Sequence, residues 1–150
     1  MQKLVFSMKK ENRHLGQVLV IAQFSLLAFI VVNGDYSFKS FQTIALVVGL
    51  CVGVWAIVAM KMKVSVFPEA NHVSVLTLSG PYKLIRHPMY TAVLLVSLAF
   101  VNTFMSLLAW VVLVLILLIK LHYEEKLLLE KFKEYKQYKH KTKRLIPFIY

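Results

Sequence analysis

The stretch that decides the fold of this 150-residue chain is RHPMYTAVLLVSLAFVNTFMSLLAWVVLVLILLIKLHYEE, residues 86–125. It contains two apolar runs, 89–101 and 104–119, which are separated only by Asn102 and Thr103. Read as one helix, the two runs would extend for about 46 Å at ~1.5 Å per residue, which is too long for one crossing of a bilayer core ~30 Å thick. The stretch therefore predicts a tight hairpin of two helices.

The composition of the whole chain places this hairpin in a membrane protein. Hydrophobic residues make up 59% of the chain and charged residues 17%, and 18 Lys and Arg against 7 Asp and Glu give a net charge of +11. A disordered chain would lack so many large apolar residues, and a disulfide-stapled secreted module is excluded because Cys51 is the single cysteine. Nucleic-acid binding would explain the charge but not the hydropathy, so no nucleic-acid partner is expected.

Four apolar runs predict an all-α, polytopic membrane protein that forms one domain over residues 1–150. The predicted transmembrane helices cover about residues 15–32, 41–60, 89–101 and 104–121. The first two have the roughly 20 residues that a helix needs to cross a bilayer. Gly49 and Gly53 form a pair of small residues four positions apart, which indicates either a close-packing face or simply the abundance of glycine in membrane helices.

The distribution of Lys and Arg predicts the orientation in the membrane. The basic excess falls in three segments, residues 1–14, residues 61–88 and the tail from residue 120. In the turn 33–40, by contrast, Asp35 balances Lys39. With four spans the three basic segments lie on one side, which the positive-inside rule makes cytoplasmic, so both termini are expected there. A bacterial inner membrane is the expected location, and an endoplasmic reticulum membrane would show the same asymmetry.

The segment before the hairpin, SGPYKLIRHPMY at residues 79–90, combines basic groups with a helix start. Pro88 suits the first position of a helix because its missing N–H would have no partner there, and the residue before a proline is kept out of helical conformation. Arg86 and His87 then lie beside a helix N-terminus, which favours a carboxylate or phosphate. The competing interpretation is a basic interfacial stop followed by an ordinary proline start.

A second polar cluster follows the last apolar run, where Glu124 and Glu125 form an acidic pair in a basic tail. Neither has a cation four residues further on, so helix salt bridging explains the pair poorly. The hairpin returns both carboxylates to the face where Arg86, His87 and Tyr90 begin. We therefore predict a site of basic, aromatic and acidic groups at the cytoplasmic rim, matched to a cofactor with an anionic group and ribose hydroxyls.

The tail beyond the acidic pair carries an apolar stripe. Leu128, Phe132, Tyr135 and Tyr138 recur at helical spacing, with lysines on the opposite side, and predict an amphipathic cytoplasmic tail helix. Such a helix lies on an anionic membrane surface or folds under the bundle as a lid, and the two are compatible.

Together these residues resemble the isoprenylcysteine carboxyl methyltransferase-like family of integral membrane methyltransferases, to which phospholipid methyltransferases are related. The resemblance covers residues 79–147 and rests on Gly80-Pro81-Tyr82, the segment from Arg86 to Tyr90, the hairpin, Glu124-Glu125, Phe132, Tyr135, Tyr138, Arg144 and Pro147. It implies a helical bundle that binds S-adenosyl-L-methionine and transfers its methyl group to a lipid-soluble, membrane-embedded or small-molecule acceptor, with O-, N- and S-methylation all open.

The resemblance also implies roles for individual residues. The implied cofactor-binding residues are Tyr82, His87, Pro88, Tyr90, Glu124, Glu125, Tyr135 and Tyr138. The implied catalytic residues are Arg86, Lys141 and Arg144, with Arg86 positioning the cofactor or an anionic substrate group, and the tail 128–147 would close over the cofactor.

The chain departs from the family pattern at Ala92, Lys133, Lys141 and Lys143. Lys141 stands where family members that act on prenylcysteine have an arginine for the substrate carboxylate, and lysine keeps the charge without the bidentate geometry. Cofactor binding is thus expected more firmly than a prenylcysteine substrate.

Two other functions stay open at this point. His87 and His122, both near the rim, would suit a haem-binding or electron-transfer subunit. The basic tail alone would suit a non-catalytic accessory protein that binds anionic lipid, but this leaves Glu124 and Glu125 unexplained. No metal site is expected, because His122 and the two glutamates lack a recognisable ligand spacing and no cysteine joins them.

Overall fold

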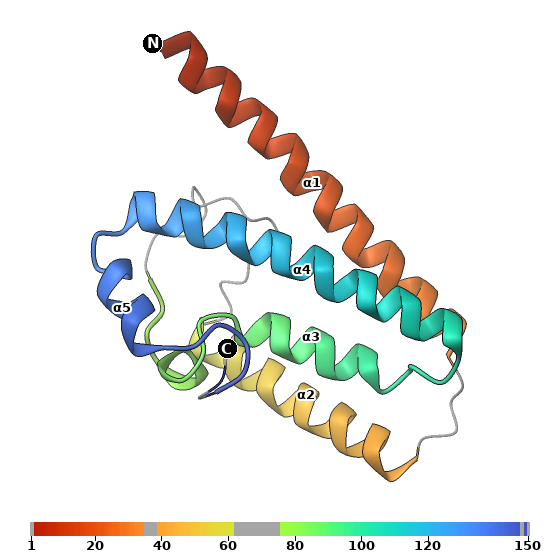
Figure 1. Cartoon of the computed structure of the whole chain (residues 1–150). Helices are drawn as coiled ribbons and strands as arrows, with labels where there is room; N and C mark the ends of the chain where they lie inside the picture. Colours follow the sequence, from red (N-terminus) through yellow and green to blue (C-terminus); the bar gives the residue numbers. More distant parts are fainter. Residues whose placement is uncertain (1, 35–38, 62–75, 148, 150) are drawn as a thin grey trace.

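The computed structural model describes residues 2–34, 39–61, 76–147 and 149, and within them every regular element is helical (Figure 1). In chain order the elements are α1 (Gln2–Val32), α2 (Ser40–Ala59), the short 3-10 helix η2 (Gly80–Lys83), α3 (Pro88–Leu98), α4 (Phe104–Lys131) and α5 (Tyr135–Lys141). The predicted all-α class is confirmed. Asp35 and residues 62–75 of the loop 61–88, whose charges support the predicted orientation, lie outside the described residues.

Among the described residues, three helices are long and apolar enough to cross a membrane: His14–Val32 within α1, Ser40–Ala59 and Phe104–Lys131. These confirm the first two predicted spans and include the last. The third predicted span, 89–101, is represented by the 11 residues of α3, which extend for about 16 Å at ~1.5 Å per residue. The helix ends at Leu98 because the next three amides bond carbonyls three residues back, which tightens the chain into a turn.

The predicted hairpin is present, with α3 and α4 running in opposite directions beside each other (Figure 1). At the start of α4, the Ser106 amide donates to Thr103 Oγ1 at 3.1 Å and the Thr103 amide donates to Ser106 Oγ at 3.0 Å. This reciprocal cap satisfies two amides that the helix start would leave unpaired. Gln42 Nε2 also donates to the Asn102 side chain, so α2 holds the turn as well.

The interior lies between α1, α3 and α4, where Ile30, Ala109, Leu113 and Leu117 form a buried cluster. On the other side, α2 packs closely on α3: a Cβ added at Gly49 would lie only 2.9 Å from Leu95 Cβ. Of the two interpretations of the glycine pair, close packing is therefore confirmed at Gly49. Large apolar side chains on α1, α2 and α4 remain exposed, as expected for helices that face lipid.

Two boundaries near the C-terminus differ from the predictions. α4 continues ten residues past the predicted end at 121, to Lys131, so Glu124 and Glu125 are in its last turns. The prediction of a single amphipathic tail helix is wrong, because Phe132 is extended, with φ −119° and ψ 111°, and a separate helix α5 follows it. Because the chain turns back there, Leu128, Tyr135 and Tyr138 still bury one another, as the apolar stripe requires.

Candidate active site

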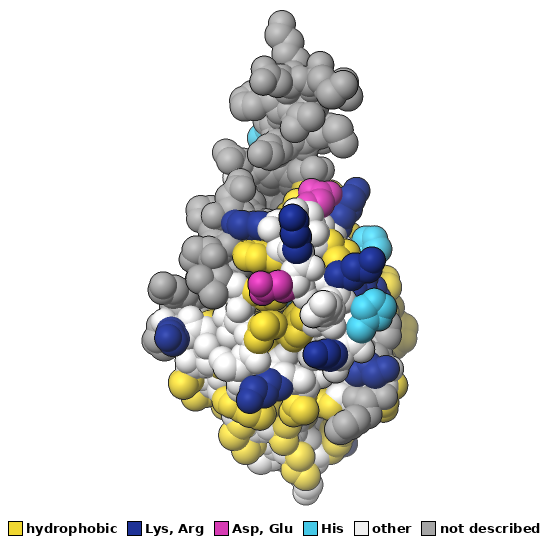
Figure 2. All heavy atoms as spheres, turned by 90° about the vertical axis from the view of Figure 1, so that its left-hand side faces the viewer, with side chains coloured by type: hydrophobic (Ala, Val, Ile, Leu, Met, Phe, Trp, Pro, Cys, Tyr) yellow, Lys and Arg dark blue, Asp and Glu magenta, His cyan; other side chains and the backbone are white. Residues whose placement is uncertain are grey.

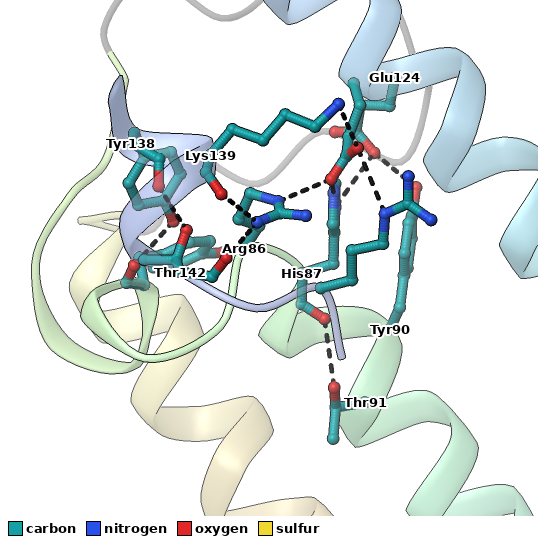
Figure 3. Close-up of polar contacts among 11 residues, drawn as sticks. Arg86, His87, Tyr90, Thr91, Glu124, Tyr138, Lys139 and Thr142 are labelled. Atoms are coloured by element: carbon teal, nitrogen blue, oxygen red, sulfur yellow. Dashed lines mark hydrogen bonds and ion pairs between the residues drawn. The ribbon is translucent and has the colours of Figure 1, made fainter. Parts of the chain in front are cut away.

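The segment before α3 is fixed by pairing with the segment after α5. The Arg86 amide donates to the Lys143 carbonyl at 2.7 Å, and the His87 amide donates to the Arg144 carbonyl at 3.0 Å. Pro88 is the first residue of α3, as predicted, and His87 before it is non-helical, with φ −125° and ψ 59°. The pairing and the proline together aim the Arg86 and His87 side chains toward the last turns of α4 (Figure 3).

Arg86 forms a buried ion pair with Glu125. The Arg86 side chain is 6% exposed and that of Glu125 is 3% exposed. Arg86 Nε donates to Glu125 Oε1 at 2.7 Å, while Nη1 donates to the Lys139 carbonyl at 3.0 Å and to the Thr142 carbonyl (Figure 3). One guanidinium therefore joins the start of α3, the end of α4 and α5. The contact confirms the prediction that the hairpin brings Glu125 to Arg86.

The other oxygen of Glu125, Oε2, has basic neighbours but no hydrogen bond from the described residues. Arg144 Nε lies 3.4 Å from it and Lys139 Nζ lies 3.7 Å from it, both beyond good hydrogen-bond geometry. A buried carboxylate oxygen of this kind can accept a hydrogen bond from a bound molecule.

Glu124 is held from the start of α3 by an aromatic pair. Tyr90 OH donates to Glu124 Oε2 at 2.7 Å, and the His87 and Tyr90 rings stack at 5.5 Å with an interplanar angle of 6°. His87 Nδ1 lies 3.8 Å from Glu124 Oε2 and Nε2 lies 3.5 Å from Glu125 Oε1. His87 Nε2 is buried without a hydrogen bond from the described residues, so one imidazole faces both carboxylates with a nitrogen available.

A buried lysine that the sequence interpretation missed lies on the membrane side of this aromatic pair. Lys120 is 2% exposed; its Nζ donates to Gln23 Oε1 at 2.9 Å and lies 5.4 Å from the Tyr90 ring centroid. The contact links α1 to the site, and Gln23 makes the packing hydrogen bond expected of a polar residue inside a membrane helix. Lys120 precedes Glu124 by one helical turn, so searching for a cation four residues before the glutamates would have found it.

Three tyrosines line the α5 side. Tyr138 OH donates to the Tyr82 carbonyl at 2.7 Å, and burial raises the pKa of Tyr138 to about 12. Tyr135 is 1% exposed and its hydroxyl has no hydrogen-bond partner among the described residues. Burial, together with the negative charge of Glu125, raises the pKa of Tyr135 well above its ordinary value, so at neutral pH it is a hydrogen-bond donor near that carboxylate.

The structure thus brings most of the predicted site residues together. Arg86, His87, Tyr90, Glu124, Glu125 and Arg144 are joined by contacts within 4 Å. Lys141 is exposed and has no ion pair with either glutamate in the described part of the chain. Pro88 contributes a buried helix start rather than a polar group.

Of the two histidines considered for haem, His87 is buried against the glutamates whereas His122 is exposed. Within the described ranges, no three His, Cys, Asp or Glu side chains are grouped as metal ligands.

These features define a class of protein: a helical integral membrane protein with a buried site of acidic, basic and aromatic groups at one end of its bundle. The model of the phospholipid methyltransferase family matches residues 38–135, nearly two thirds of the chain, and the chain belongs to this family. No curated protein and no solved structure matches it. The match runs from the start of α2 to Tyr135, so it includes both polar clusters, and it makes the protein a membrane methyltransferase.

Proposed function

We propose that this protein transfers a methyl group from S-adenosyl-L-methionine to a lipid-soluble or membrane-embedded acceptor at the cytoplasmic face, as an enzyme of the isoprenylcysteine carboxyl methyltransferase-like type. One observation carries the proposal: Glu124 and Glu125 are held opposite Arg86, His87 and Tyr90 in a buried site. The family match supports methyl transfer in a membrane.

The residues present fit this cofactor, because the site has buried polar atoms whose hydrogen-bonding capacity is unused within the described chain. Glu125 Oε2 accepts hydrogen bonds, Tyr135 OH donates them, and His87 Nε2 does either according to its protonation. A molecule with an amino group, a carboxylate and ribose hydroxyls offers the matching groups. Glu124 and Glu125 would bind hydroxyl or amino groups of the cofactor. Tyr135 and His87 would donate hydrogen bonds to its carboxylate or other hydrogen-bond acceptors.

When bound, the cofactor supplies a methyl group activated by a positively charged sulfur. Methyl transfer to a nucleophile depends on alignment and exclusion of water more than on a strong base. The chain provides alignment through the Arg86–Glu125 pair, which fixes α3, α4 and α5 relative to one another. Contacts of Lys139, Thr142 and Arg144 with Arg86 or Glu125 support the proposal that the tail closes over the site.

We also propose that α3, with the turn 99–101, is a fourth and short crossing of the bilayer. It lies beside α2 and α4 (Figure 1), and most of its residues are apolar. With four crossings, both termini and the site lie on the same side, which the positive-inside rule makes cytoplasmic, and we propose a bacterial inner membrane as the location. Labelling of single cysteines introduced at Lys39 and Lys133 with a membrane-impermeant reagent in intact cells tests this. With four crossings the two positions lie on opposite sides of the membrane, so only one should be labelled, and equal labelling would contradict the proposal.

Binding of S-adenosylhomocysteine to the purified protein, measured by calorimetry in nanodiscs, tests the cofactor proposal. Glu124→Gln should weaken binding by at least roughly tenfold, because a hydrogen bond to a charged group contributes about 1.5–3 kcal/mol. Glu130→Gln is the matched control, since Glu130 is an exposed glutamate on the same helix. Absence of binding by the unmodified protein would refute the proposal. Labelled S-adenosyl-L-methionine with membrane extracts would then identify the acceptor.

A further inference from the structure

A cleft of about 650 Å³ opens among α5, the end of α4 and the segment after α5. Its basic lining side chains are Arg86, Lys136, Lys139, Lys141, Lys143 and Arg144. None of the described residues that line it is Asp or Glu. Figure 2 looks at this end of the molecule and shows Lys, Arg and His side chains spread across it, with few acidic ones between them.

The positive charge of this cleft exceeds what the acidic groups near it balance. Arg86, Lys139 and Arg144 all approach one carboxylate, that of Glu125. The three other lysines of the cleft, Lys136, Lys141 and Lys143, are exposed, and none forms an ion pair with a described acidic residue. Among the described residues, the cleft therefore has more cations than neighbouring carboxylates, and a concave surface of this kind concentrates positive potential and attracts an anionic ligand.

The same cleft has apolar lining. Leu129, on the last turns of α4, is 39% exposed, and Ile149 is 75% exposed. α4 reaches this cleft directly from its apolar membrane-spanning part. A free phosphate or a nucleic acid would use the cations but not these two side chains, whereas a lipid with a negative headgroup would use both.

We propose that this cleft binds the phosphodiester headgroup of an anionic phospholipid, with the start of the acyl chains against Leu129 and Ile149. The cleft shares Arg86, Lys139 and Arg144 with the candidate active site, but lipid binding there does not depend on methyl transfer. On the cytoplasmic side proposed above, lipid phosphates are the anions that this end of α4 would meet, and each nearby Lys or Arg strengthens such binding.

Native mass spectrometry of the full-length protein in detergent, titrated with phosphatidylglycerol or phosphatidylcholine, tests the proposal. The cleft variant is Lys136→Gln with Lys143→Gln. The control is Lys126→Gln with Lys133→Gln, which removes the same charge from exposed lysines that do not line the cleft. Phosphatidylglycerol should bind the unmodified and control proteins alike, and the cleft variant at least about tenfold more weakly.

Equal losses in both double variants would overturn the proposal, because general surface charge would then explain the binding. Displacement of the lipid by inorganic phosphate at similar concentration would also overturn it, since the apolar lining would then contribute nothing. Equal retention of phosphatidylcholine would exclude selection for a net negative headgroup. The measurement contains no methyl donor, so its outcome is separate from that of the methyltransferase proposal.

Discussion

At its first turn α4 is held by a neutral network that is local in sequence, and at its last turns by a charged network between distant residues. Ser106 Oγ accepts hydrogen bonds from the amides of Asn102 and Thr103, which are four and three residues away. At the other end Glu124 and Glu125 bond residues 34 and 39 positions away.

The two networks also differ in how completely they are satisfied. The local one satisfies its own amides at the start of α4, with one further bond from Gln42 to Asn102, whereas the distant one leaves Glu125 Oε2, His87 Nε2 and Tyr135 OH without hydrogen bonds from the described residues. Buried polar groups are normally paired, so unpaired ones at one end indicate where a ligand binds.

The largest expected effect is at the charged end. Arg86→Met should lower the free energy of unfolding by about 3–5 kcal/mol, because it leaves the Glu125 carboxylate buried without its main partner. Thermal or denaturant unfolding in detergent measures this, with Lys133→Met as an exposed control. Arg86→Met combined with Glu125→Met should cost less than the single change. A loss below about 1 kcal/mol in the single variant would mean that the ion pair does not hold this end together.

A smaller loss is expected where α1 joins the site. Gln23→Leu should cost about 1–3 kcal/mol, because the buried Lys120 ammonium loses its hydrogen-bond acceptor. Gln17→Leu is the matched control, since Gln17 is exposed on the same helix. Adding Lys120→Met should recover stability, because both partners are then apolar. Additive losses in the double variant would show that the two side chains are not coupled.

The neutral end should respond only modestly. Ser106→Ala removes half of the reciprocal cap and should cost about 1 kcal/mol, compared with Ser25→Ala at an exposed position of α1. Because this end has no role in the proposed site, S-adenosylhomocysteine binding should not change. Weakened binding in a folded Ser106→Ala protein would remove the contrast between the two ends.

The smallest effect on stability is expected at Tyr135. Tyr135→Phe removes a buried hydroxyl without a described partner, so the free energy of unfolding should stay within about 0.5 kcal/mol or rise. S-adenosylhomocysteine should nevertheless bind roughly fivefold to tenfold more weakly, because the hydroxyl is proposed to donate to the ligand. Tyr138→Phe should instead lower the free energy of unfolding and leave S-adenosylhomocysteine binding unchanged, since its hydroxyl already donates to the Tyr82 carbonyl. Unchanged S-adenosylhomocysteine binding in Tyr135→Phe would show that the Tyr135 hydroxyl does not bind the ligand.

Helix boundaries were predicted less well than helix positions. The continuous apolar run ends near 121, but the residues that follow are strong helix formers, so α4 continues to Lys131. The run 89–101 likewise includes three residues beyond α3, since apolar side chains also occur in a buried turn.

The tail shows why an apolar stripe alone was insufficient. Leu128, Tyr135 and Tyr138 are buried together whether or not the helix is interrupted at Phe132. The break is determined by contacts far along the chain, where Lys143 pairs with Ile85 and Tyr138 bonds Tyr82. No local pattern contains that information.

The sequence by itself determined the membrane class, the hairpin, the start of α3 at Pro88 and the meeting of the acidic pair with the Arg-His segment. Each depends on the length of an apolar run or on the geometry of one residue, so local physics suffices. Only the tertiary structure decided that Arg86 pairs with Glu125, Tyr90 with Glu124 and Lys120 with Gln23. These partners are 34 to 97 residues apart, and the choice among them depends on how helices of fixed length and direction pack.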